Sequence, residues 1–265
     1  MKTFRHLTVA IGAALLCAAG AAQASQNTTQ LSYSNLQFQV IDLTPDDGIA
    51  AGFTVLQNTT SITLLTQTPY DVRTGQQIVS SGQGGPLTAS LQYQNITLAG
   101  STPGISSGSL TGTISDEDTV DSRGLGGLRN TVYFELAPNT ALLLTGHLEL
   151  TLGQSAGLPA GVGSLARGFV DMELYGMPQS TISHATATLG KNTWAHGTGL
   201  FEDDLSLVIS NRSDVVRRGG TSIELGIDTR YYTAGVPAVP EPASYGMLVT
   251  GLAVAGLMAR RRKQA

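Results

Sequence analysis

The clearest periodic pattern in the chain is NTVYFELAPNTALLLTGHLELTLG, residues 130–153. In its first part apolar residues stand at every second position, and in its second part leucines do so around a single glycine. A period of two is typical of strands with one buried face. Pro138-Asn139 lies between the two parts and is typical of a turn. The stretch therefore predicts two antiparallel strands of a half-buried sheet.

The same alternation recurs along most of the chain. Apolar residues alternate in the segments 36–40, 87–98, 170–174, 205–209 and 223–227. Turn-forming residues punctuate these segments, and no stretch between 25 and 235 has a long helical period. The sequence predicts an all-β fold: a single antiparallel β-sandwich, jelly-roll-like and with ten or more strands, over residues 25–235.

Composition supports an extracellular, turn-rich domain. Among 265 residues, serine and threonine together number 53, glycine adds 32, and only 13% are charged. This composition excludes a coiled coil, and the net charge of −4 excludes a nucleic-acid binder, which needs a basic surface for phosphate. The only cysteine is Cys17, so the region beyond it can form neither a disulfide nor a thiolate metal site.

Residues 1–24 carry the features of a secretory signal peptide. A basic start is followed by an uncharged apolar run, predicted to be helical, and by a small-x-small end. We expect signal peptidase to recognise Ala22 and Ala24 and to leave Ser25 as the mature N-terminus. The alternative is an N-terminal anchor that is not cleaved.

A second apolar run covers residues 243–259. Seventeen residues of helix span roughly 26 Å at about 1.5 Å per residue, which is the short limit for a transmembrane helix. The basic tail, residues 260–265, follows at once and should stop transfer and stay in the cytoplasm; its cations are Arg260, Arg261, Arg262 and Lys263. The alternative is a buried core helix, which would not need a terminal block of cations.

The segment 236–242 is rich in proline and should be extended in front of this helix. It ends in Pro240, Glu241 and Pro242. Pro-Glu-Pro, an apolar span and an arginine-rich end, in this order, resemble the PEP-CTERM sorting signal of Gram-negative bacteria. The resemblance implies recognition by exosortase, a precursor held in the inner membrane with a periplasmic ectodomain, and a mature form at the cell surface or in the extracellular matrix. It also implies an association with exopolysaccharide and biofilm.

Four carboxylates within residues 116–121 form a candidate calcium site, with Asp116, Asp118 and Asp121 as ligands. The EF-hand pattern fails, because neither the glycine nor the final glutamate of that loop is present. The alternative, which the pattern favours, is a solvated acidic loop balanced by Arg123 and Arg129. No other cofactor is expected.

Trp194 lies in a polar segment and is a candidate for stacking on a sugar ring; the favoured alternative is a core tryptophan. The histidines of the exported domain, His147, His184 and His196, have no metal-ligand spacing and no HExxH motif.

Carboxylates for glycoside hydrolysis would have to come from Glu149, Glu173 and Glu224. Each of these alternates with apolar neighbours, which favours a solvent-facing position on a strand.

Residues 25–239 hold 18 acidic and nine basic residues, a net charge of −9 that should repel acidic polymers. Two functions remain from the sequence. The first is a non-enzymatic exported surface or matrix protein that binds polysaccharide. The second is a secreted β-sandwich enzyme that acts on polysaccharide. Since no recognisable catalytic set is present, we expect the first.

Overall fold

The alternating segments form long strands. The computed structural model describes residues 26–68, 72–81, 83–115, 121–154, 163–175 and 181–231, and these residues are nearly all β-strand. The strands are β1 (Gln26–Asp42), β2 (Phe53–Gln67), β3 (Arg73–Ser81), β4 (Leu87–Tyr93), β5 (Ile96–Gly104), β6 (Ser107–Ser115), β7 (Ser122–Leu136), β8 (Thr140–Gln154), β9 (Gly163–Tyr175), β10 (Thr181–Asn192), β11 (Gly199–Asn211) and β12 (Arg217–Tyr231).

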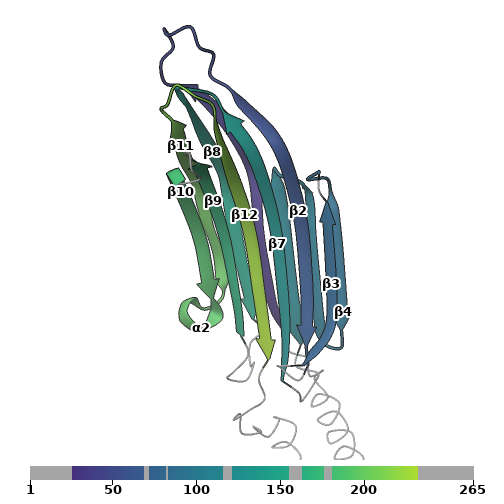
Figure 1. Ribbon diagram of the computed structural model, residues 1–265. Coiled ribbons are helices and arrows are strands. Elements are labelled where there is room, and N and C mark those ends of the chain that lie inside the picture. The colour runs from purple at the N-terminus through teal and green to yellow at the C-terminus, as the bar shows by residue number, and fades with distance from the viewer. Residues whose placement is uncertain are drawn as a thin grey trace, which may run out of the picture. The chain divides into compact units, whose positions relative to one another are not determined.

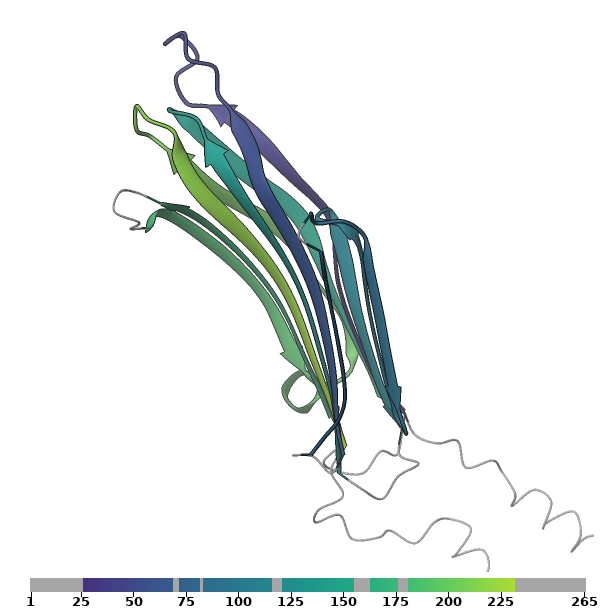
Figure 2. The ribbon, with the colours of Figure 1, turned by 45° about the vertical axis from the view of Figure 1, so that its right-hand side comes forward.

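The strands form two antiparallel sheets that lie face to face (Figures 1 and 2). Sheet A has the order β11-β8-β1-β6-β5-β4, and sheet B has the order β10-β9-β12-β7-β2-β3. Hairpins join β2 to β3, β4 to β5 and β6, and β9 to β10, whereas the other connections pass between the sheets. The predicted antiparallel β-sandwich of ten or more strands is confirmed. In the described part of the chain the only helix is a single turn, α2 (Thr193–His196), between β10 and β11.

The chain enters and leaves this sandwich at the same end. Gln26, the first residue of β1, pairs with Ser115 at the end of β6. Ser122, which follows β6 along the chain, pairs with Tyr231 at the end of β12. The connections from β1 to β2, from β7 to β8 and from β11 to β12 therefore lie at the opposite end (Figure 1).

The core lies between the sheets and follows the predicted alternation in most strands, whereas Val40, near the end of β1, is 38% exposed. Within residues 130–153, Val132, Phe134 and Leu136 of β7 are fully buried, as are the alternating leucines of β8. Their neighbours on the other parity, such as Tyr133 and Glu135, lie on the outer face. At about 25 cal/mol per Å² of apolar surface removed from water, these inner faces supply the main driving force for folding.

Glycines on the inner faces let large side chains of the opposite sheet approach closely. Gly100 on β5 lies beneath Ile62 of β2, and a Cβ atom there would stand 2.8 Å from Ile62 Cγ2 and 3.0 Å from Leu110 Cδ2. Since real Cβ contacts are essentially never shorter than 3.0 Å, Gly100 has no room for a methyl group.

A polar bridge crosses the same core. The amide of Asn130 on β7 donates to the hydroxyl of Tyr33 on β1, and Thr60 on β2 donates to the Asn130 side-chain oxygen. All three side chains are buried, and burial raises the pKa of the Tyr33 hydroxyl, which stays neutral. Because a buried polar group without a partner is costly, this bridge fixes how the two sheets are aligned.

The first prediction concerns the inner glycines. Gly100→Ala should lower the free energy of unfolding by about 1–3 kcal/mol, because overpacking forces the buried Ile62 and Leu110 to move. The control is Gly226→Ala on β12, where the nearest atom to a new Cβ would be the Arg167 carbonyl oxygen at 3.9 Å. Denaturant unfolding of the two variants measures the difference. Equal stabilities would show that the sheets are not held this closely.

The second prediction concerns the polar bridge. Tyr33→Phe should lower the free energy of unfolding by about 1–3 kcal/mol, because it leaves the buried Asn130 amide without this acceptor. Tyr133→Phe removes the same hydroxyl from a side chain that is 44% exposed, and it should change stability by less than about 0.5 kcal/mol. A Tyr33→Phe variant as stable as the wild type in urea would contradict the role of the bridge.

Candidate functional site

Two tyrosines flank a glycine on the outer face of sheet B. Tyr133 on β7 and Glu173 on β9 both pair with Gly220 on the strand between them, β12. A Cβ atom at Gly220 would lie 3.6 Å from Tyr133 Cδ1 and 3.7 Å from the Tyr175 hydroxyl. The two rings therefore border a position without a side chain, and Tyr133 is 44% exposed.

Tyr175 is held in place by its neighbours on β9. Burial, together with a hydrogen bond to the Glu173 carboxylate and the nearby charge of Asp171, raises the pKa of Tyr175 to about 12. The phenol therefore remains protonated at neutral pH and serves as a hydrogen-bond donor.

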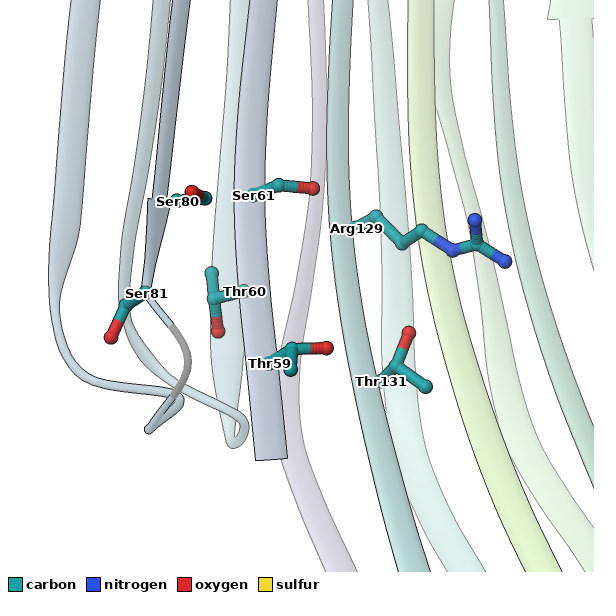
Figure 3. Close-up of a pocket in the computed structure, with 7 residues that line it drawn as sticks. All are labelled: Thr59, Thr60, Ser61, Ser80, Ser81, Arg129 and Thr131. Atoms are coloured by element: carbon teal, nitrogen blue, oxygen red, sulfur yellow. The ribbon is translucent and has the colours of Figure 1, made fainter. Parts of the chain in front are cut away.

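A small hollow lies on the same sheet where β3, β2 and β7 run side by side (Figure 3). It has a volume of about 200 Å³, below the roughly 300–1,000 Å³ of pockets that enclose a small molecule. Arg129 points away from β2 and pairs with Glu224 on β12 at 3.0 Å. The hollow is thus a hydroxyl-rich depression rather than a charged cleft; its lining residues are Thr59, Thr60, Ser61, Ser80, Ser81, Arg129 and Thr131.

Another hollow of about 340 Å³ lies on the outer face over β9 and β12. The guanidinium of Arg167 stands 5.6 Å from the centroid of the Phe169 ring, and Glu224 lines the same hollow. Sheet B therefore presents aromatic rings, hydroxyl groups and paired charges on one surface. These are the groups that stack on sugar rings and hydrogen-bond to sugar hydroxyls.

The strand register also brings together a histidine and three carboxylates on the outer face of sheet A. His147 and Glu149 lie on β8, directly opposite Asp204 and Glu202 on the edge strand β11. His147 Nδ1 is 2.8 Å from Asp204 Oδ1, and His147 Nε2 is 3.8 Å from Glu202 Oε1. The hydrogen bond with Asp204 raises the pKa of His147, as do the charges of Asp204, Glu202 and Glu149, against a smaller lowering by desolvation.

Sheet B has a similar cluster on β9 and its edge strand β10. His184 Nε2 lies 2.5 Å from Asp171 Oδ1 and 3.9 Å from Glu173 Oε1. Sequence reasoning missed both clusters, because each combines residues of two strands whose register is set by the fold. The only signal in the sequence was the i, i+2 spacing of His147 with Glu149 and of Asp171 with Glu173, which places each pair on one face of a strand.

Most of the residues that the sequence singled out for binding are not described. Asp116 and Asp118 lie outside the described residues, so the calcium site with Asp121 stays a prediction. The backbone of Trp194 belongs to α2, where the side chain of Asn192 accepts a hydrogen bond from the Ala195 amide, but its own side chain is not described. Its sugar-stacking role also stays a prediction.

The three glutamates considered for glycoside hydrolysis do not converge. Glu149 lies on sheet A, whereas Glu173 and Glu224 lie on sheet B. On sheet B, Glu224 forms an ion pair with Arg129, and the Glu173 carboxylate accepts a hydrogen bond from the Tyr175 hydroxyl. As the alternation predicted, all three face outward, and Glu173 and Glu224 are engaged with neighbouring side chains.

The sorting residues lie outside the described part of the chain. This applies to the signal peptide 1–24 with Ala22, Ala24 and Ser25, to the linker 236–242, and to the apolar run 243–259 with the basic tail 260–265. Among the residues that are described, no helix is long and apolar enough to cross a membrane.

Comparison with known proteins identifies the C-terminal segment. Residues 238–263 match the family model of the PEP-CTERM protein-sorting motif. No curated protein and no solved structure matches the chain at a significant level. The resemblance carried by Pro240, Glu241 and Pro242 is thus confirmed. The motif supports an exported protein that exosortase processes, with a membrane-anchored precursor and export to the cell surface.

Proposed function

We propose that this protein is a non-enzymatic component of the cell surface or extracellular matrix, which contacts neutral exopolysaccharide in a biofilm through the outer face of sheet B. The observation that carries the proposal is the sorting motif at residues 238–263, which addresses the sandwich to the cell surface. In this proposal residues 243–259 hold the precursor in the inner membrane, with the ectodomain in the periplasm, until processing frees it.

The surface of sheet B supports the polysaccharide contact. Tyr133 and Tyr175 flank the buried Gly220, and the hydroxyl-rich hollow of β2 and β3 lies on the same sheet. An exposed sheet face with aromatic rings and hydroxyl groups suits an extended neutral chain of sugars, which can be contacted without being enclosed. The net charge of −9 over residues 25–239 argues against an acidic polymer.

The arrangement of carboxylates supports a role without catalysis. A glycosidase needs two carboxyl groups on either side of one bond, roughly 5–9.5 Å apart. Glu149 lies on the outer face of sheet A, so the full thickness of the sandwich separates it from Glu173 and Glu224, which share the outer face of sheet B. The hollows of sheet B are lined mainly by hydroxyl groups and by charges that are already paired.

Replacing Pro240, Glu241 and Pro242 by alanine tests the sorting step. The substitution leaves the apolar span and its cations unchanged, and moving one cation to mid-bilayer costs about 2.5–3.5 kcal/mol. Topology should therefore be preserved, and the full-length form should accumulate in the inner membrane of a host that carries exosortase. Fractionation with a C-terminal tag measures this. If wild type and triple variant retain the tag in the membrane equally, the segment is a permanent anchor.

Replacing the tyrosines of sheet B tests the polysaccharide contact. Affinity electrophoresis through gels that contain dextran should retard the wild type, and Tyr133→Ala and Tyr175→Ala should each weaken binding about two- to tenfold. This range corresponds to about 0.5–1.5 kcal/mol for one aromatic stacking partner. Leu200→Ala on sheet A removes a side chain that is 56% exposed and should have no effect.

Dextran sulfate in the same assay separates ring stacking from attraction between charges. We expect the wild type to bind dextran sulfate no better than dextran, because the domain is acidic. Equal retardation of wild type and both tyrosine variants would rule out this face as the contact surface, while leaving the sorting step intact.

A further inference from the structure

The outer face of sheet A holds a histidine and two glutamates with their ligand atoms close together. His147, Glu149 and Glu202 each offer one ligand atom, and these atoms lie within 4.8 Å of one another. In a tetrahedral zinc site with bonds of about 2.1 Å, ligand atoms stand roughly 3.4 Å apart. The 3.8 Å between His147 Nε2 and Glu202 Oε1 is close to this value, so small side-chain movements complete the geometry.

We propose that His147, Glu149 and Glu202 form a binding site for a divalent transition-metal ion such as zinc, which links β8 to the edge strand β11. Imidazole nitrogen together with carboxylate oxygen is a ligand set that suits Zn²⁺ and its first-row neighbours. Three protein ligands leave the fourth position to a water molecule or to a ligand from solution.

His147 already has the orientation that a metal ligand needs. Its Nδ1 atom contacts Asp204 on the strand directly opposite, so the Nε2 atom faces Glu202. In metal sites the second nitrogen of a ligating histidine usually donates to such a carboxylate, which fixes the tautomer and the plane of the ring. Asp204 is therefore a positioning residue and not a ligand.

The strand register also places two like charges against each other. Glu149 and Glu202 are direct partners across the β8–β11 pair, an arrangement that destabilises a sheet unless a cation intervenes. On the other side of β8, the partners of Glu149 and His147 are Ser32 and Ser34, which carry no charge. Within the described residues, the ion pairs of Glu202 and Asp204 are made to His147 alone.

The second cluster provides an internal comparison. On sheet B the nitrogen that faces the carboxylates, His184 Nε2, is already in contact with Asp171 at 2.5 Å. A metal ion there would have to displace this contact, whereas on sheet A the contact to Asp204 uses the other nitrogen of the ring. We therefore assign the site to His147 and not to His184.

Isothermal titration with zinc chloride tests the site. The full chain is purified with a tag that contains no histidine, and Cys17→Ser is introduced throughout so that no thiol competes. The wild type should bind one zinc ion, and His147→Gln and Glu202→Gln should each weaken binding at least tenfold. The matched controls His184→Gln and His196→Gln should bind as the wild type does.

Thermal unfolding provides a second readout. Zinc should raise the melting temperature of the wild type, EDTA should reverse the rise, and His147→Gln should melt as the wild type does without zinc, since its side chain lies on the outer face. The proposal is wrong if His147→Gln binds zinc as tightly as the wild type, if His184→Gln abolishes binding instead, or if the wild type binds only at millimolar zinc.

Discussion

The close approach of the two sheets governs the packing of the core and the hydrogen bonds that cross it. It is made possible by glycines on each inner face that receive isoleucines from the opposite sheet. Gly112 of sheet A lies beneath Ile227, and Gly124 of sheet B lies beneath Ile96, each with less than 3.0 Å between a new Cβ and the facing side chain. Because interiors are packed as densely as organic crystals, neither glycine can be enlarged without moving its partner.

The polar bridge depends on this close approach. Tyr33 belongs to sheet A and Asn130 to sheet B, so their hydrogen bond forms only when the two inner faces are almost in contact. Side chains of sheet B also contact the two edge strands of sheet A, β11 and β4. The Ser210 amide of β11 donates to Ser183 on β10, and the Ser90 amide of β4 donates to Gln77 on β3. Each edge of sheet A is thus partly covered by a side chain from sheet B, which leaves fewer backbone groups for pairing with the strand of another chain.

A strand could be predicted from the sequence where its inward-facing side chains are apolar, and not where they are polar. Residues 130–153 alternate apolar side chains with polar ones, and their strands and buried face are as expected. The start of β1 was missed, because its inward positions include the buried Asn27 and Thr29, which carry no hydrophobic signal. The alternation seen from Leu36 onward begins within a bulge between Ser34 and Gln37 and covers only the second part of that strand.

The candidate sites were harder to predict than the fold for a physical reason. Alternation tells which face of a strand a residue occupies, but not which strand lies beside it. His147 and Glu149 could be placed on one outer face from the sequence, whereas their partners Glu202 and Asp204 are more than fifty residues away and meet them only through the register of β8 and β11. The same holds for Tyr133 and Tyr175, which become neighbours because β12 lies between their strands and has a glycine there.

The sorting motif and the sandwich determine different properties of this protein, namely its destination and its contacts. An address at residues 238–263 is a local signal that can follow any exported domain, so it determines where the protein goes and not what it contacts there. The contacts must come from the outer faces and the loops. The two outer faces extend along the strands, from the end where the chain enters and leaves the sandwich to the opposite end. In the proposed function, the hydroxyl-rich and aromatic outer face of sheet B follows a polymer along the strands, which a closed pocket cannot do.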